Sequence, residues 1–285
     1  MPSPRLLVIE GNTAASRAEH LAAGGVIASE GYADLLRGLL PGVLVDICCP
    51  ADAEATLPQP SGLEAYDGVA ITGSSLHVYE WGPPVARQVE LVRAVFAARI
   101  PVFGSCWGLQ VLTVAAGGSV RANQRGRELG FGRRIRLTPA GRDHPMYHGK
   151  ADPFDAMTVH LDEVETLAPG TIVLASNAMS QVQSAEIPRL LAWGTQYHPE
   201  YPLREVAVIV RRTGKKLVDE GFFMDESDLE RYSAELDALD RAPTKALAWR
   251  HGTDAAVLDK GMRVKEIANW IAHQVLPTRS RRGRQ

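Results

Sequence analysis

A cysteine, Cys106, lies between two glycines in the stretch GSCWG, which runs from Gly104 to Gly108. The apolar residues before it predict a buried strand, and those after it predict the start of a helix. Gly-x-Cys-x-Gly between strand and helix predicts a sharp turn that exposes the thiol, because glycines let the two elements approach closely. A helix N-terminus also favours thiolate over thiol, so the pattern indicates a nucleophile. The alternative is a buried core cysteine.

An activated cysteine needs a base and a group that orients the base. The segment GTQYHPEYP supplies both, about ninety residues beyond the cysteine. His198 precedes a proline, which disfavours helix, and in extended chain the side chains of His198 and Glu200 share a face. The carboxylate would hold the imidazole while the other ring nitrogen meets the thiol of Cys106, as in a Cys–His–acid triad. Taken alone, His198 is better interpreted as a structural histidine at a strand end, and only its combination with the Cys106 turn favours the catalytic interpretation.

The elements that must position these residues alternate between strand and helix in the first hundred residues. Apolar runs predict strands at 5–10, 42–49, 66–73 and 100–105, and helical spacing predicts helices at 33–40 and 84–99. Such alternation predicts an α/β fold, an open mostly parallel sheet with helices on both faces. Active sites in such sheets lie beyond the carboxyl ends of the strands, and Cys106 lies at one of these ends.

The second half of the chain begins with strand-like segments that follow one another with little helix between them. They lie at 131–138, 156–162, 171–177, 181–187 and 190–198. We expect antiparallel or mixed strands that complete the sheet, together with a smaller flanking sheet. A helical segment is expected from about 203 to 220.

Two further helical patterns follow, DESDLERYSAELDALDRAP and VKEIANWIAHQVL. In the second, apolar residues at three- and four-residue spacing from Val264 to Val275 predict one buried face. Packing on the chain's own sheet is favoured over docking on a second subunit or a synthase. The predicted organisation is therefore a domain at 1–220, a helical extension packed on it at 221–276, and a disordered basic tail at 277–285.

Composition and charge restrict the function classes. The chain has 285 residues, 45% hydrophobic and 22% charged, with a formal net charge of −2. This balance gives no reason to expect nucleic acid or a membrane surface as partner, and the apolar runs are too short to span a bilayer. Without a signal-peptide pattern at the start, a cytoplasmic location is expected.

The other candidate ligands in the sequence predict neither a metal site nor a cofactor. Cys48 and Cys49 are adjacent, which disfavours a disulfide between them, and they receive no function. The stretch HPMYH places His144 and His148 four residues apart, but it lacks further ligands and predicts a solvated loop rather than a zinc site.

Together, the two motifs resemble those of the class I, triad-type glutamine amidotransferases, which pair a G-x-C-x-G-x-Q elbow with a later Q-x-H-P-E. Here the motifs are Gly104–Gln110 and Gln196–Glu200. The resemblance, nearest to the stand-alone amidotransferase portion of GMP synthetases, covers about residues 5 to 205 and implies a flavodoxin-like amidotransferase fold. AITGSS (70–75) is similar to the family's glycine-bearing loop, and MTVHLDEV (157–164) is similar to a segment that contacts bound glutamine.

The resemblance implies a role for each residue of the motifs. Cys106 would attack the glutamine side-chain amide, and the backbone N–H groups of Gly73 and Trp107 would form the oxyanion hole. His198 would protonate the departing ammonia and then activate water, with Glu200 orienting it. The implied substrate-binding residues are Gln110, Ser75 and His160.

Three functions remain open from the sequence. The first is a free-standing glutamine amidotransferase or glutaminase, releasing glutamate and ammonia, with a separately encoded synthase as one candidate partner. The second is a hydrolase of the same fold that acts on another γ-glutamyl amide or peptide. It is kept open because Gly73 is followed by two serines and by an aromatic segment, LHVYEW, where a lid would lie. The third is a non-catalytic binding or regulatory module.

Overall fold

The computed structural model describes residues 3–55 and 62–283, and within them nine strands form one sheet in the order β2-β1-β3-β4-β11-β10-β9-β6-β7. Five strands are parallel: β1 (Arg5–Ile9), β2 (Leu44–Cys48), β3 (Gly68–Ile71), β4 (Val102–Ser105) and β11 (Ala192–Thr195). The other four strands are each antiparallel to their neighbours in the sheet: β10 (Ser184–Ile187), β9 (Ile172–Ser176), β6 (Glu128–Leu137) and β7 (Phe154–His160). A flanking sheet pairs β5 (Ser119–Ala122) with β8 (Asp162–Thr166). The expected α/β fold is confirmed.

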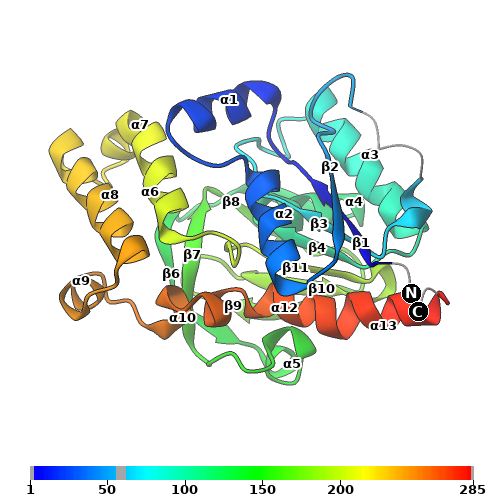
Figure 1. Ribbon diagram of the computed structural model, residues 1–285. Helices are drawn as coiled ribbons and strands as arrows, with labels where there is room; N and C mark the ends of the chain where they lie inside the picture. The colour runs from blue at the N-terminus through cyan, green and yellow to red at the C-terminus, as the bar shows by residue number, and fades with distance from the viewer. Residues whose placement is uncertain (1–2, 56–61, 284–285) are drawn as a thin grey trace.

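Helices cover both faces of the sheet because its strands are apolar on both sides (Figure 1). Along β1, Leu6 and Val8 belong to one core cluster, whereas Leu7 and Ile9 belong to the other. The first cluster includes side chains of α2 (Ala28–Leu39). The second includes those of α3 (Pro83–Ala97) and α4 (Trp107–Ala115), the helix that follows Cys106.

A third core cluster lies where the helices after the sheet pack on β6 and β7. Its buried members include Met157, Val206 and Leu236. These helices are α6 (Leu203–Arg212), α7 (Gly214–Asp219) and α8 (Glu226–Arg241). The remaining helices are α1 (Ala14–Ala22) and the shorter α5 (Pro139–Arg142), α9 (Lys245–Arg250), α10 (Ala255–Leu258) and α11 (Lys260–Arg263). Single 3₁₀ turns lie at Leu63–Ala65, Pro145–Tyr147 and Pro188–Leu190.

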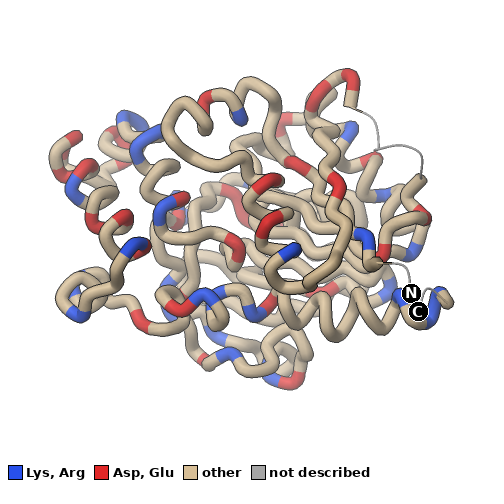
Figure 2. Tube along the Cα trace, viewed as in Figure 1, with Lys and Arg blue, Asp and Glu red and all other residues tan. Residues whose placement is uncertain are grey.

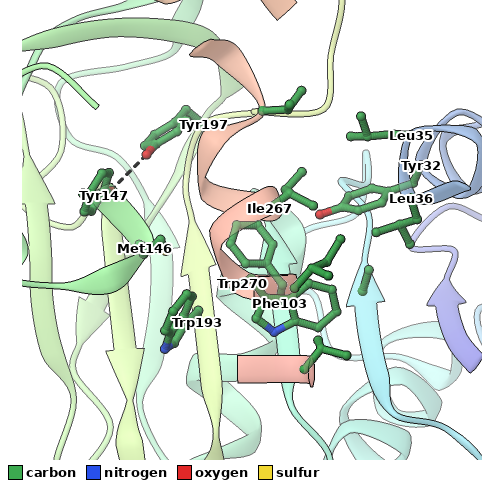
Figure 3. Close-up of a cluster of buried hydrophobic side chains, with 14 of the residues drawn as sticks. Tyr32, Leu35, Leu36, Phe103, Met146, Tyr147, Trp193, Tyr197, Ile267 and Trp270 are labelled. Atoms are coloured by element: carbon green, nitrogen blue, oxygen red, sulfur yellow. Dashed lines mark hydrogen bonds between the residues drawn. The ribbon is translucent and has the colours of Figure 1, made fainter. Parts of the chain in front are cut away.

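The C-terminal helices lie along one face of the sheet, beside α2 (Figure 1). They are α12 (Lys265–Trp270), a π-helical turn at Ile271–Val275 and α13 (Leu276–Arg281). The predicted apolar stripe, including Ile267 and Trp270, is buried in the same cluster as the strands and α2. Figure 3 shows Trp270 beside Phe103 of β4, with ring centroids 6.0 Å apart. This end of the chain therefore packs on its own sheet.

The prediction of a disordered tail from residue 277 is wrong for the part that the structure describes. Helix α13 continues to Arg281, because basic side chains expected to be solvated have partners on the domain. Arg279 lies 3.3 Å from a carboxylate oxygen of Asp67, and Arg282 donates to the carbonyl of Tyr66 at 2.9 Å. Residues 284–285 lie outside the described ranges. The division of the chain at residue 220 stays a prediction.

Charged residues of both signs are interspersed along the trace (Figure 2). None of the helices in residues 3–55 and 62–283 has the length and apolar character needed to cross a membrane.

If the extension is part of the core, Trp270→Ala should lower the free energy of unfolding by about 3–5 kcal/mol, because it empties a fully buried site. Trp249 on α9 is 86% exposed, so Trp249→Ala is the matched control and should change it by less than about 0.5 kcal/mol. Urea unfolding of both full-length variants measures the difference. Equal effects would contradict the assignment of the extension to the core.

Candidate active site

The backbone at Cys106 is bent into an unusual conformation between β4 and α4. Its φ is 53° and its ψ is −102°, a combination that costs about 1–3 kcal/mol for a residue with a side chain. The bend is held by a hydrogen bond from the Cys106 N–H to the carbonyl of Thr195, at 2.7 Å. A Cβ on Gly104 would lie 2.4 Å from the carbonyl carbon of Gly108, so the strand and the helix touch as the sequence predicted.

The thiol of Cys106 is buried, and only 5% of the residue is exposed. This differs from the exposed turn that the sequence predicted, because neighbouring chain segments cover the bend. The sulfur lies 3.8 Å from the carbonyl oxygen of Val159 and accepts a hydrogen bond from the side-chain amide of Gln196 at 3.5 Å. The thiol therefore lies at the base of a pocket.

His198 is held by its backbone and by two contacts of its ring. Its backbone N–H donates to the carbonyl of Met157 at 2.8 Å, and its Nδ1 lies 2.7 Å from Oε1 of Glu200. The ring of Tyr201 stacks on it, with centroids 3.9 Å apart and planes within 3°. The expectation that His198 and Glu200 share a face agrees with this geometry.

The charges around His198 favour its protonated form. Burial opposes a charge on the ring, but the carboxylate of Glu200 and the sulfur of Cys106 outweigh it and raise the pKa of the imidazole to about 10. With Nδ1 directed at Glu200, the Nε2 proton is the one available to the sulfur. The order of the three buried side chains is therefore Glu200, His198 and Cys106, with the imidazole in the middle.

The two backbone N–H groups predicted to form the oxyanion hole belong to residues beside Cys106 and His198. Trp107 is the first residue of α4, where amide protons have no partner within the helix. Gly73 directly follows Thr72 at the end of β3, and a Cβ there would lie 2.6 Å from Cε1 of His198. The imidazole therefore needs glycine at this position.

The pocket above the thiol has a volume of about 180 Å³, and its lining includes Cys106 and His198. One carboxylate, that of Asp162, contributes to the lining. The Arg and Lys side chains of the lining are Arg17, Arg127, Arg212 and Lys216. The described lining is therefore predominantly cationic, which suits an anionic ligand group.

The three predicted substrate-binding residues all line this pocket. They differ in how many of their polar atoms already have hydrogen-bond partners within the protein. Gln110 donates to the side-chain oxygen of Gln196 at 3.3 Å. The backbone N–H of Ser75 donates to the side-chain oxygen of Asn12 at 3.1 Å. The hydroxyl of Ser75 lies 2.8 Å from that of Ser16. The ring nitrogens of the third, His160, lie 2.9 Å from the Glu128 carboxylate and 2.9 Å from the carbonyl of Asp162.

Sequence reasoning missed two residues at the thiol. Gln196 lies two residues before His198, so the same-face rule that joined His198 to Glu200 would have included it. Tyr201 carried no such signal, because its stacking depends on how the chain turns after Pro199. Of the aromatic segment expected as a lid, His77 lines the pocket, whereas Tyr79 and Trp81 do not and are 43% and 59% exposed.

The comparisons with known proteins agree with this fold. The family model "Glutamine amidotransferase class-I" matches residues 44–213. A γ-glutamyl-L-1-hydroxyisopropylamide hydrolase from a Pseudomonas species is 35% identical over 99% of this chain and 97% of its own length. A glutamine-hydrolysing GMP synthase component from Methanoculleus marisnigri is 29% identical over 42% of this chain and 62% of its own length.

A solved structure shares the fold at low sequence identity. A glutamine amidotransferase from Thermotoga maritima has a TM-score of 0.65 and 19% identity, and the match covers 95% of this chain and 98% of that one. The chain thus belongs to the class I glutamine amidotransferase family. The predicted function class, a glutamine amidotransferase or γ-glutamyl amide hydrolase, is confirmed at that level.

The proton on His198 should be lost near pH 10, and in Glu200→Gln at a lower pH, because the carboxylate that favours the charged ring is gone. Below this pKa the ring carries its charge, and above it the charge is lost. Ring ¹³C NMR against pH measures this, with the resonance assigned through His198→Gln. Glu205→Gln is the matched control, since Glu205 pairs with His20 at 3.0 Å instead. A wild-type His198 that titrates near 6.5 would contradict the charge arrangement.

Proposed function

We propose that this protein hydrolyses a γ-glutamyl amide through a covalent thioester on Cys106, with His198 as proton carrier and Glu200 as its orienting partner. The observation that carries the proposal is the buried imidazole of His198, which lies 2.7 Å from the Glu200 carboxylate and lines the same pocket as the sulfur of Cys106, whose proximity raises the pKa of the ring. A nucleophile paired with a base that a third group orients is the arrangement that covalent acyl transfer requires.

In the first half of the reaction, the sulfur of Cys106 forms a bond to the amide carbon while the carbonyl electron pair moves to oxygen. The resulting oxyanion would be stabilised by the N–H groups of Gly73 and Trp107, at about 3–4 kcal/mol for each such donor. The oxyanion then collapses, the carbon–nitrogen bond breaks, and His198 gives its proton to the leaving nitrogen. The products of this half are a free amine and a γ-glutamyl thioester.

In the second half, water replaces the amine. Neutral His198 takes a proton from water as the water oxygen attacks the thioester carbon, and the second oxyanion collapses by breaking the carbon–sulfur bond. Glutamate leaves, and the imidazolium and the Cys106 sulfur are restored. Glu200 stabilises the ring in both halves because its carboxylate lies on Nδ1.

The pocket lining supports recognition of the glutamyl part. Arg17 and Arg127 are paired with Asp52 at 2.7 Å and with Glu220 at 2.8 Å. Arg212 and Lys216 therefore best suit the α-carboxylate that every γ-glutamyl compound carries. We assign Gln110 and Ser75 to substrate contact, because both line the pocket. We also assign His160 to the pocket lining. Both of its ring nitrogens already have partners, so the ring would contact the substrate by van der Waals packing rather than by a new hydrogen bond.

The leaving group is best described as a small amine other than ammonia, with water as acceptor. The full-length relative acts on a γ-glutamyl hydroxyalkylamide, and its similarity extends through the C-terminal helices. Those helices pack on the chain's own sheet, so this face is not left for a synthase. The second candidate is ammonia donation to a separate synthase, which the match to a GMP synthase component favours. A non-catalytic module is disfavoured by the intact Cys106, His198 and Glu200. We retain a cytoplasmic location as part of the proposal.

A substrate panel separates these functions. The purified protein is incubated with glutamine and with γ-glutamyl amides of methylamine, isopropylamine and a hydroxyalkylamine, while glutamate and the amine are measured. We expect kcat/KM for an alkylamide to exceed that for glutamine. A preference for glutamine would instead support the ammonia donor, and turnover of none of these compounds would contradict the proposed function.

Cys106→Ala should lower turnover by at least about 10⁴-fold, because no other group can form the thioester. Its melting temperature should stay near that of the wild type. A glutamine-analogue electrophile should label Cys106 alone, as detected by peptide mass spectrometry. Cys48 and Cys49 are free thiols on the same chain and serve as internal controls. Equal labelling of all three would remove the special role of Cys106.

Gly73→Ala should lower kcat by about 10²-fold, because the added methyl would displace the imidazole of His198. Gly82→Ala, in the same connection, is the matched control, since the nearest atom to its Cβ would be 3.9 Å away. Steady-state kinetics on the best substrate of the panel compare the two. A Gly73→Ala enzyme as active as the control would show that His198 does not depend on this close approach.

A further inference from the structure

Helix α12 carries a carboxylate into the core of the protein. The side chain of Glu266 is fully buried, and its Oε1 lies 2.9 Å from the ammonium of Lys150, of which 2% is exposed. The same ammonium donates to the carbonyl of Met262 at 3.0 Å. A buried ion pair of this kind seldom stabilises a protein more than a well-packed apolar pair would, so its presence calls for another explanation.

The carboxylate of Glu266 also accepts a hydrogen bond from Tyr197, a residue next to the candidate active site. The hydroxyl of Tyr197 donates to Oε1 of Glu266 at 2.7 Å, in a fully buried position. Tyr197 lies between Gln196, whose side-chain amide donates to the sulfur of Cys106 at 3.5 Å, and His198, the predicted base. Successive side chains of an extended segment point in opposite directions. Hence the same three residues face the thiol on one side and the C-terminal extension on the other.

A second tyrosine, Tyr147, extends the hydrogen-bond network from Tyr197 to the sheet. The hydroxyl of Tyr147 lies 3.0 Å from that of Tyr197 and donates to the hydroxyl of Ser184 on β10 at 2.5 Å. Figure 3 shows the two tyrosines joined by the hydrogen bond between their hydroxyls. Bonds in such a buried network polarise one another and have narrow geometric tolerance, so they fix the ring of Tyr197 in one place.

We infer that Glu266 is a positioning residue for the reaction: through Tyr197 it sets the orientation of the 196–198 segment, so that Gln196 and His198 are directed at Cys106. The C-terminal extension thereby becomes part of the catalytic apparatus without touching the substrate. This inference rests on the proposed function for its kinetic test, but the reactivity of the cysteine tests it without any substrate.

The first test removes the connecting hydroxyl. Tyr197→Phe keeps the ring and should lower kcat by about 10-fold with KM changed less than about twofold, since substrate contacts are intact. Asn269→Ala is the matched control: its amide donates to the carbonyls of Met146 and His148 at 2.9 and 3.0 Å, so it also fastens α12 but does not reach Tyr197. The control should lower the melting temperature and leave kcat unchanged. Equal kcat values for both variants would overturn the inference.

A second test asks whether the acceptor oxygen of Glu266 matters rather than its charge. Lys150→Met is combined either with Glu266→Gln, which keeps an acceptor for Tyr197, or with Glu266→Leu, which removes it. Both double variants are free of buried charge at this site. We expect the Gln variant to keep near-wild-type kcat and the Leu variant to fall about 10-fold below it. Equal kcat in the two would overturn the role of Glu266 even if Tyr197→Phe fails to fold.

The rate of Cys106 alkylation by iodoacetamide gives a readout independent of substrate choice. Displacing His198 should reduce the rate in Tyr197→Phe and shift its pH dependence, whereas Asn269→Ala should match the wild type. If the whole substrate panel is inert but alkylation separates these variants, the proposed substrate class fails and the positioning inference stands. If the panel is turned over but alkylation and kcat are the same in all variants, the positioning inference fails alone.

Discussion

The bend at Cys106 is the constraint on which the rest of the site depends. A side-chain-bearing residue with φ of 53° is tolerated only where the surroundings leave no alternative, and here a hydrogen bond to Thr195 closes the junction at 2.7 Å. Strand β11 lies beside β4, with Thr195 opposite Ser105. The residues that follow this pair, Gln196 and Cys106, are therefore neighbours, and His198 follows at the next position on the same face. Parallel pairing of two strands is thus the physical origin of the contact between nucleophile and base.

The sequence predicted the parts of this arrangement that depend on local chemistry. The glycines around Cys106 indicate the tight turn, and the proline after His198 indicates extended chain, which fixes the shared face with Glu200. The apolar stripe around Ile267 indicates a buried helix face. Each of these inferences uses only neighbours in the chain, so they can be made without knowledge of the strand order.

Other parts could not be predicted because they depend on contacts between distant segments. The stacking of Tyr201 on His198 depends on how the chain turns after β11. The helical end of α13 depends on partners at Asp67, more than two hundred residues earlier. The polar contacts of His160 depend on Glu128 in β6. Composition and spacing carry no signal for these contacts, because the partners in each contact come from segments that are far apart in the chain.

The two faces of the sheet contribute to the site in different ways. The face covered by α3 and α4 supports the nucleophile, since Trp107 is buried in that cluster directly after Cys106. The face covered by α2 and α12 supports the base, since Tyr197 is buried in the other cluster directly before His198. The geometry between sulfur and imidazole, at the carboxyl ends of β4 and β11, therefore depends on both cores at once. A loss of packing on either face would separate the two groups, although most of those packing residues touch neither of them.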